Sequence, residues 1–385
     1  GDPPLGNATE WAWHEADEKV VSVDLIDNKE VFPLELNTMP GWAGSSWYFN
    51  RYMDPKNQNE FVQKDKLDYW GMVDLYIGGS EHATGHLLYS RFWQKVLFDL
   101  GYVPVDEYAQ KLVNQGMILG ESAFIYRKTG TQTYLSAGLV QGENVEPIHV
   151  DVAYVDANNV VSHQELHNWR PEFGEATFEL EEGQLIAKRE IEKMSKSKYN
   201  VVNPDDICDL YGADTLRVYE LFLGPIEQAK PWNTAGISGV YGFLNKYWRL
   251  FHENEQFSVS DEPPSPGMLK SLHTTIEKVT RDIDQFSFNT AVSAFMICIN
   301  ELTAAKCNHR AILEPLTVLL EPFAPHICEE LWEKLGHTPS LSNEPLPIAD
   351  SIHLKETQIT YPISFNGKMR FTLDLDADAT SEEVE

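Results

Sequence analysis

The sequence predicts an α/β protein that continues into an α-helical bundle. Residues 73–77 form a short apolar run that ends in Gly78-Gly79, and apolar residues then recur with helical spacing as far as Leu100. This order of strand, glycine turn and helix is typical of a parallel α/β sheet, in which ligands bind at the carboxyl ends of the strands. From about residue 205 onward the apolar residues recur every three or four positions, which predicts packed helices.

The segments on either side of this first motif differ in character. Residues 1–35 begin rich in proline and glycine and show no sustained period, so we expect a connector. "KLVNQGMIL", residues 111–119, predicts another buried strand of the sheet or the end of a strand. Residues 121–190 alternate β-type stretches with Gly and Asn turns and contain many aromatic and β-branched residues, which predicts a small β-rich insertion.

The helical part is expected to contain four helices, with a linker at residues 261–267 ("DEPPSPG"). Proline lacks a backbone donor, so Pro315, Pro322 and Pro325 are expected to break the fourth helix. Beyond residue 350 the apolar residues alternate around Asn366-Gly367, which predicts a β-hairpin. The helical periodicities run over residues 237–251, 269–286 and 288–302 and over the segment after Arg310.

The composition limits the classes of function. The chain has 385 residues, of which 30 are Lys or Arg and 59 are Asp or Glu, which gives a net charge of −29. This charge disfavours broad non-specific nucleic-acid binding, so any RNA contact must use local basic patches. The four cysteines lack CxxC spacing and suit a reducing cytoplasm, and no stretch approaches the roughly 20 apolar residues of a membrane span.

One small basic island stands out in this acidic chain. "KMSKSK" places Lys193, Lys196 and Lys198 within six residues of one another, separated by Met194, Ser195 and another serine. A mobile loop of lysines and small hydroxyl residues suits transient binding of a polyphosphate, because lysine is a point charge that can follow a moving phosphate. The alternative is an ordinary solvated run of lysines.

Several long motifs, in the same order, resemble one enzyme family. "KMSKS" with "NVVNPDDICDLYGADTLRVYELF" resembles the second signature of class I aminoacyl-tRNA synthetases. "LEPFAPHICEELWEKLG" resembles the helical anticodon-binding domain of the subgroup for leucine, isoleucine, valine and methionine. "SSWYFNRYMDP" and "DLYIGGSEHATGHLLYSRFWQKVLFDLG" resemble the bacterial leucyl-tRNA synthetases, and the β-rich insertion before "KMSKS" is similar to their leucine-specific insertion.

The resemblance implies a division of the chain into six parts. The fold would combine the second half of a class I Rossmann-like nucleotide-binding fold, carrying the insertion, with an anticodon-binding bundle. "HATGH" has one residue too many for the first signature, His-x-Gly-His, so we expect a C-terminal piece that lacks that half and the editing domain and is inactive alone. The expected parts are a connector from the editing domain (1–35), the catalytic half (36–120), the insertion (121–190), the KMSKS loop and stem-contact region (191–236), the anticodon-binding helices (237–350) and the start of a truncated C-terminal domain (351–385).

The activity implied is ATP-dependent joining of leucine to tRNA-Leu through leucyl-adenylate, in a cytoplasmic monomer that does not bind membranes. ATP and Mg²⁺ would be required, with no protein metal site. Lys193 and especially Lys196 would close over the β- and γ-phosphates, and Ser195 would let the loop approach closely. Positioning and charge stabilisation would supply most of the catalysis.

The resemblance also implies which residues bind the nucleotide. Gly79 would allow close backbone approach and Glu81 would accept from both ribose hydroxyls, although Glu81 has the alternative of being an ordinary surface carboxylate. The residues from Gln115 to Ile118 would present backbone groups to the adenine edge. The complete set implied for ATP or adenylate is Gly79, Glu81, His82, Gln115, Gly116, Met117, Ile118 and Met194.

The leucine pocket implied by the resemblance consists of Trp42, Ser45, Tyr48 and His86. A plain core role remains an alternative for Trp42, Tyr48 and His86. Trp42 replaces the phenylalanine typical of the family, and Gly44 replaces an acidic residue. Such an aromatic slot rewards branched aliphatic side chains, but one methylene is worth only about 1–3 kcal/mol.

Two other functions remain open. A neighbouring isoleucyl, valyl or methionyl enzyme is disfavoured by "GGSEHATGH" and by the insertion. A non-enzymatic tRNA-binding protein with a synthetase-like body is disfavoured by the intact "KMSKS" and Glu81. The expected tRNA platform is the helical part, although solvated faces are the alternative for each of its cationic residues Lys246, Arg249, Lys278, Arg281, Lys306 and Arg310.

Overall fold

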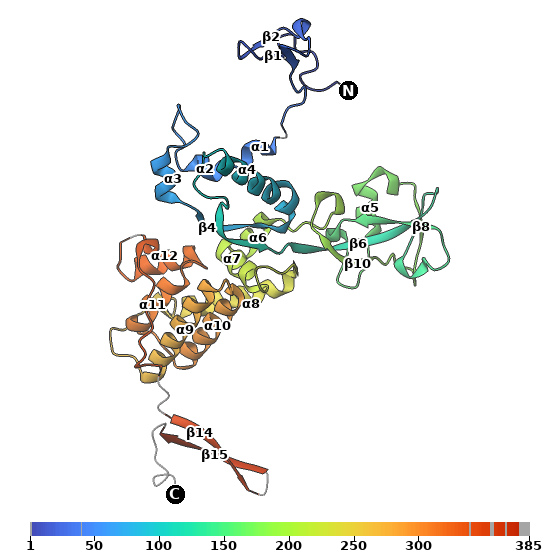
Figure 1. Ribbon diagram of the computed structural model, residues 1–385. Coiled ribbons are helices and arrows are strands. Elements are labelled where there is room, and N and C mark those ends of the chain that lie inside the picture. Colours follow the sequence, from blue (N-terminus) through green and yellow to red (C-terminus); the bar gives the residue numbers. More distant parts are fainter. Residues whose placement is uncertain (1, 40, 339, 355–357, 366–367, 377–385) are drawn as a thin grey trace. The chain divides into compact units, whose positions relative to one another are not determined.

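The computed structural model describes residues 2–39, 41–338, 340–354, 358–365 and 368–376 (Figure 1). The chain divides into two compact units, Gly1–Gln115 and Gly116–Glu385. Within the described ranges, no helix is long and apolar enough to cross a membrane. All four cysteines are free thiols, and three of them are buried.

The first unit begins with a small antiparallel sheet in the order β2-β1-β3. Residues 1–35, which we expect to be a connector, thus contain three short paired strands. The turn that leads into β3 is stabilised by Asp27, whose carboxylate accepts from the backbone N–H groups of Lys29, Glu30 and Val31. The strands are β1 (Ala12–His14), β2 (Lys19–Val21) and β3 (Val31–Pro33).

The predicted strand, glycine turn and helix are confirmed in the rest of the first unit. Strands β4 and β5 pair in parallel, with Gly79 beside Gln115 at their carboxyl ends. Of the two alternatives for residues 111–119, the strand end is confirmed, because β5 ends at Gln115. The buried strand is wrong, because Val113 is buried but Leu112 is 47% exposed, and a sheet of two strands covers few of its own side chains. The elements are α1 (Trp42–Ser45), α2 (Tyr48–Tyr52), α3 (Lys64–Trp70), β4 (Val73–Gly79), α4 (Leu88–Asp99) and β5 (Ala109–Gln115).

The predicted β-rich insertion is confirmed as part of a six-stranded sheet built around the long strand β6. Strands β8 and β10 pair with β6 in antiparallel, and the short β11 pairs with it in parallel. Tyr134 and Phe173 pack in its core together with Leu166 of helix α5 (His163–Trp169). The strands are β6 (Ile118–Lys128), β7 (Thr133–Leu135), β8 (Val145–Val150), β9 (Thr177–Glu179), β10 (Lys188–Lys193) and β11 (Lys230–Pro231).

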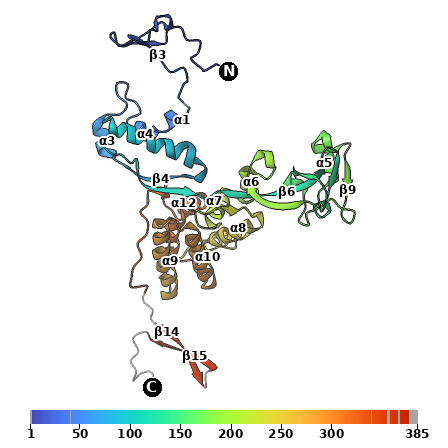
Figure 2. The same cartoon turned by 45° about the vertical axis from the view of Figure 1, so that its right-hand side comes forward.

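The predicted helices from residue 204 onward share one hydrophobic core. Helices α9 and α10 pack side by side (Figures 1 and 2). The buried residues of both helices belong to the same core as Tyr247 and Leu316. A short hairpin of β12 (His252–Glu253) and β13 (Gln256–Phe257) follows α8. The helices are α6 (Pro204–Tyr211), α7 (Ala213–Phe222), α8 (Thr234–Arg249), α9 (Pro266–Asp284), α10 (Phe288–Ala304), α11 (Arg310–Leu320) and α12 (Pro325–Lys334).

The prediction that three prolines break the fourth helix is confirmed for Pro322 and Pro325 and wrong for Pro315. Helix α11 ends before Pro322, and Pro325 occupies the first turn of α12, where its missing donor costs nothing. Pro315 lies inside α11 without breaking it. Burial of Ile312, Leu316 and the neighbouring leucines offsets the roughly 3 kcal/mol that an interior proline costs.

The predicted C-terminal hairpin is confirmed by antiparallel pairing of β14 (Gln358–Phe365) with β15 (Lys368–Asp376). Its predicted turn, Asn366-Gly367, lies outside the described residues.

We expect Asp214→Ala to destabilise the helical part by about 1–3 kcal/mol. The buried Asp214 carboxylate accepts from the backbone N–H groups of His326 and Ile327 at the start of α12 and from His326 Nδ1 at 2.7 Å. Chemical denaturation with circular dichroism measures the loss. The matched control Asp209→Ala, at an exposed site on α6, should change the free energy of unfolding by less than about 0.5 kcal/mol. Equal effects of both variants would contradict the capping role.

Candidate active site

The β6–β10 ladder determines where the lysine loop begins. Strand β10 ends at Lys193, which pairs with Leu119 of β6, one residue beyond Ile118. On β6 itself, Ile118 pairs with Lys230 of β11. The ladder therefore brings two predicted groups of residues together in the second unit, the start of the lysine loop and the Gly116–Ile118 segment.

Two of the three lysines in the loop have no ion-pair partner in the part of the chain that the structure describes. Lys193 and Lys196 are exposed, and neither contacts a carboxylate among the residues that the structure describes. Lys198 instead lies 2.6 Å from Glu192 Oε1. The Ser195 hydroxyl lies 3.0 Å from the Ser197 hydroxyl, so the small serines face one another within the loop. In an acidic chain, two unpaired lysines in one short loop provide a local site for an anion.

The segment from Gly116 to Ile118 is closely crossed by another part of the second unit. A Cβ on Gly116 would overlap the backbone of Gln228, so only glycine fits there. The Gly116 N–H donates to Ile226 O at 2.8 Å, and Met117 O accepts from Lys230 N at 2.9 Å. The Gly116 N–H is therefore already paired, whereas Met117 O accepts one hydrogen bond and keeps a second lone pair.

The predicted ribose-binding residues meet at the carboxyl end of the β4–β5 pair, in the first unit. Gly79 pairs with Gln115, and a Cβ on Gly79 would overlap the Glu81 carboxylate. His82 Nε2 lies 4.0 Å from Glu81 Oε1, and both side chains are exposed. A flexible carboxylate beside a bare backbone at a strand end is suited to hydrogen bonding with vicinal hydroxyl groups.

The predicted leucine-pocket residues are also brought close together in the first unit. Tyr76 Oη lies 2.8 Å from Tyr48 Oη and 2.6 Å from His86 Nε2. Burial raises the pKa of Tyr76, while burial and the neighbouring His82 lower the pKa of His86. The network is satisfied when Tyr48 donates to Tyr76 and Tyr76 donates to a neutral His86.

The remaining two pocket residues lie on α1. Trp42 is 58% exposed, and its ring covers Gly85, where no Cβ would fit. The ring edge also contacts Tyr89, at 6.3 Å between centroids. Ser45 donates from its hydroxyl to Trp42 O at 3.0 Å.

The sequence patterns did not reveal an apolar hollow on the other side of α1. Its lining is almost entirely hydrocarbon, and it includes Gly44, one of the two positions that depart from the family pattern. The widely separated aromatic residues gave no periodic signal that joins them. The lining residues are Met39, Ala43, Gly44, Trp47, Phe61, Trp93, Leu97 and Tyr102.

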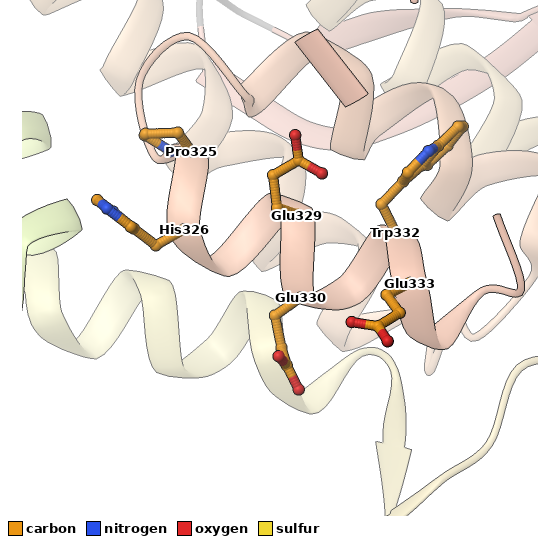
Figure 3. A pocket seen from close by; sticks show the side chains of 6 residues that line it. All are labelled: Pro325, His326, Glu329, Glu330, Trp332 and Glu333. Carbon is orange, nitrogen blue, oxygen red and sulfur yellow. The ribbon is translucent and has the colours of Figure 1, made fainter. Parts of the chain in front are cut away.

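A second hollow runs along α12 (Figure 3). Glu329, Glu330 and Glu333 project from this helix beside Trp332, so the hollow is acidic and unsuited to RNA phosphate.

Among the six cationic residues expected on the helical part, Lys278 pairs with Asp282, Arg310 pairs with Asp261 and Glu314, and Lys246 donates to Asn300. No carboxylate partner exists in the described ranges for Arg249, Arg281 and Lys306.

Known proteins match the chain in its parts and over its length. Residues 267–385 match the family described as the anticodon-binding domain of tRNA ligase, and residues 173–232 match class I tRNA synthetases for I, L, M and V. A leucine–tRNA ligase of Flavobacterium johnsoniae is 59% identical over 100% of the chain, and one of Parabacteroides distasonis is 56% identical over 100%. Over its whole length the chain is a homologue of part of the leucine–tRNA ligases.

The family relationship extends to solved structures. A LeuRS of Agrobacterium radiobacter, crystallised in a ternary complex with tRNA and LeuAMS, matches 93% of the chain with a TM-score of 0.61 and 28% sequence identity. The chain spans about 40% of the length of the family members it matches, 40% for the first and 41% for the second bacterial relative. The matches confirm the predicted fold class, a class I synthetase segment with an anticodon-binding helical domain.

We expect His86 to remain neutral below pH 6.5, because its surroundings lower its pKa from the ordinary value of about 6.5. The unfolded chain takes up this proton near pH 6.5 and native His86 only at lower pH, so His86 reduces stability as the pH falls below 6.5. A histidine NMR titration, with His86→Gln to assign the resonance, measures the pKa. A value at or above 6.5 for His86 would contradict the neutral network.

Proposed function

We propose that the full-length gene product is a leucine–tRNA ligase that activates leucine with ATP and transfers it to tRNA-Leu. The observation that carries this proposal is an identity of 51–59% to leucine–tRNA ligases across the chain. The unpaired Lys193 and Lys196, at the end of the β6–β10 ladder, support the same reaction. Leucine, ATP and tRNA-Leu are substrates found in the cytoplasm. We therefore propose that the protein acts there, as a monomer.

In the proposed reaction, the lysine loop stabilises the negative charge of the departing pyrophosphate. A leucine carboxylate oxygen attacks the α-phosphorus of ATP, the bond from that phosphorus to the bridging oxygen breaks, and pyrophosphate departs with its negative charge. We assign Lys193 and Lys196 to the β- and γ-phosphates, where their charge stabilises the leaving group. Ser195 and Met194 shape the loop between them.

We assign the other residues to substrate positioning. Glu81, with Gly79, His82 and Gln115 beside it, is proposed to bind the ribose of ATP. The strand end at Gly116, Met117 and Ile118 is proposed to lie near adenine, with Met117 O and Gly116 N–H already paired within the protein. Trp42, Ser45, Tyr48 and His86 are proposed to contact the leucine side chain.

Mg²⁺ would accompany ATP. No group of three His, Cys, Asp or Glu side chains among the described residues is placed to hold a metal ion. We therefore assign no ligand and no reaction step to Mg²⁺ in this chain.

The experiment that tests the proposal is ATP–pyrophosphate exchange by the full-length gene product, with leucine, isoleucine, valine and methionine in parallel. We expect exchange that prefers leucine, and none from residues 1–385 alone. Preference for another amino acid would overturn the roles of Trp42, Tyr48 and His86. Exchange with none of the four would favour a tRNA-binding protein without activity.

We expect Lys196→Ala in the full-length protein to lower the rate of leucine-dependent exchange on the order of 10²-fold, because a charge that stabilises the leaving pyrophosphate is lost. The KM for leucine should stay within about twofold, since Lys196 is not assigned to the leucine pocket. The matched control is Lys188→Ala, an exposed lysine on β10 that pairs with Glu190. A large rise in the KM for leucine with an unchanged rate would remove Lys196 from this role.

A further inference from the structure

We propose that Asn200 is the positioning residue of the lysine loop, an inference that rests on the proposed function. Its side chain is 2% exposed and lies at the carboxyl end of the loop, beyond the three lysines. Asn200 does not lie among the residues assigned to substrate. It acts on the reaction through the backbone that carries Lys193 and Lys196.

The side-chain amide of Asn200 makes two hydrogen bonds to the backbone of the first turn of the loop, at Lys193 and Ser195, and we call this pair of bonds the bracket. Its Oδ1 accepts from Ser195 N at 2.9 Å, and its Nδ2 donates to Lys193 O at 3.3 Å. A backbone N–H can only donate and a carbonyl can only accept, so these two partners fix the orientation of the amide. The bracket requires a donor and an acceptor on one short side chain, which asparagine provides and aspartate does not.

The bracket is attached to the long strand β6. Asn200 Nδ2 also donates to the hydroxyl of Ser122, which lies on β6 and is 0% exposed. Two residues earlier on the same strand, a Cβ on Gly120 would lie 2.5 Å from Asn200 O and 2.9 Å from Met194 Cγ. Glycine therefore lets the loop lie directly on the strand, and Asn200 holds it there.

The distal end of the loop is fixed by separate contacts. Lys198 Nζ lies 2.6 Å from Glu192 Oε1, and Glu192 Oε2 lies 3.0 Å from His149 Nε2 on β8. Lys198, Ser122 and His149 lower the pKa of Glu192 to about 2, so its carboxylate stays charged at neutral pH. This pairing removes Lys198 from the set of lysines available to phosphate.

Tyr199 completes the attachment. It adopts a left-handed backbone conformation, with φ of 53°, and its carbonyl accepts from Val152 N at 3.2 Å. Its ring packs against Trp169, at 4.7 Å between centroids, and lies beneath the guanidinium of Arg170. The exposed lysines Lys193 and Lys196 thus stand on a backbone that is held from both ends.

This arrangement predicts a specific kinetic effect. Without Asn200, the loop keeps all of its lysines and its net charge but loses the contacts that set the direction of Lys193 and Lys196. The loss should therefore appear in steps that involve the phosphates and leave leucine binding unchanged.

The test uses Asn200→Ala, Asn200→Asp and Ser122→Ala in the full-length gene product, with Asn158→Ala as a matched control at an exposed asparagine of the insertion. Leucine-dependent ATP–pyrophosphate exchange gives kcat and the KM values for ATP and leucine. Limited trypsin digestion with mass spectrometry measures cleavage after Lys193 and Lys196 and does not depend on activity.

We expect Asn200→Ala to lower kcat at least tenfold, with the KM for leucine within twofold of wild type, and to speed cleavage in the loop. Asn200→Asp keeps only the acceptor, so it should also lose activity, and Ser122→Ala should give a smaller loss because the bracket remains. A normal kcat and normal cleavage for Asn200→Ala would overturn the proposal. An equal rise in the KM values for leucine and ATP, beyond twofold, would also overturn it.

Two safeguards separate the possible failures. If Asn200→Ala does not fold, as judged by its melting temperature, Ser122→Ala decides the question, and wild-type kcat and cleavage for that variant would overturn the anchoring role of β6. If the wild-type protein shows no exchange with any amino acid, the proposed function fails. The rate of cleavage in the loop then still decides whether Asn200 holds it.

Discussion

The antiparallel ladder between β6 and β10 is the constraint on which the candidate site of the second unit depends. Its register pairs Lys193 with Leu119, so the last residue of β10 and the first residues of β6 lie side by side. The same strand β6 pairs with β8 and β11, and it carries Ser122, which bonds to the end of the loop. A slip of one residue would turn every side chain of β10 to the opposite face of the sheet.

Charge is distributed so that a few cations remain available in a strongly acidic chain. Most cationic side chains for which the structure gives partners lie in ion pairs, such as Arg91 with Glu107 and Lys128 with Glu179. Lys198 follows the same pattern with Glu192. The exposed Lys193 and Lys196 are exceptions, and an anion that enters the loop need not displace a carboxylate to reach them.

The β-rich insertion is joined to the lysine loop by more than sequence continuity. His149, Val152, Trp169 and Arg170 all belong to it, and each contacts Tyr199 or Glu192 at the ends of the loop. A rigid frame around a short exposed loop holds the lysines near one geometry, which reduces the entropy lost when phosphate binds. The insertion therefore contributes to the candidate site through positioning.

The sequence by itself determined the elements whose signals are local. The apolar periodicities predicted the helices α8 to α10, the glycine pair at the end of β4 predicted where that strand ends, and the motifs around "KMSKS" predicted the similarity to leucine–tRNA ligases. Local signals failed where burial outweighed propensity, as at Pro315 within α11, and where too few neighbours cover a strand, as at Leu112. Only the tertiary structure decided that Lys198 is paired, that Trp42 is exposed and that Asn200 reaches Ser122, which lies 78 positions away along the chain. The contact between Asn200 and Ser122 joins residues far apart in sequence, and all three features depend on strand register and packing, which one-dimensional patterns do not encode.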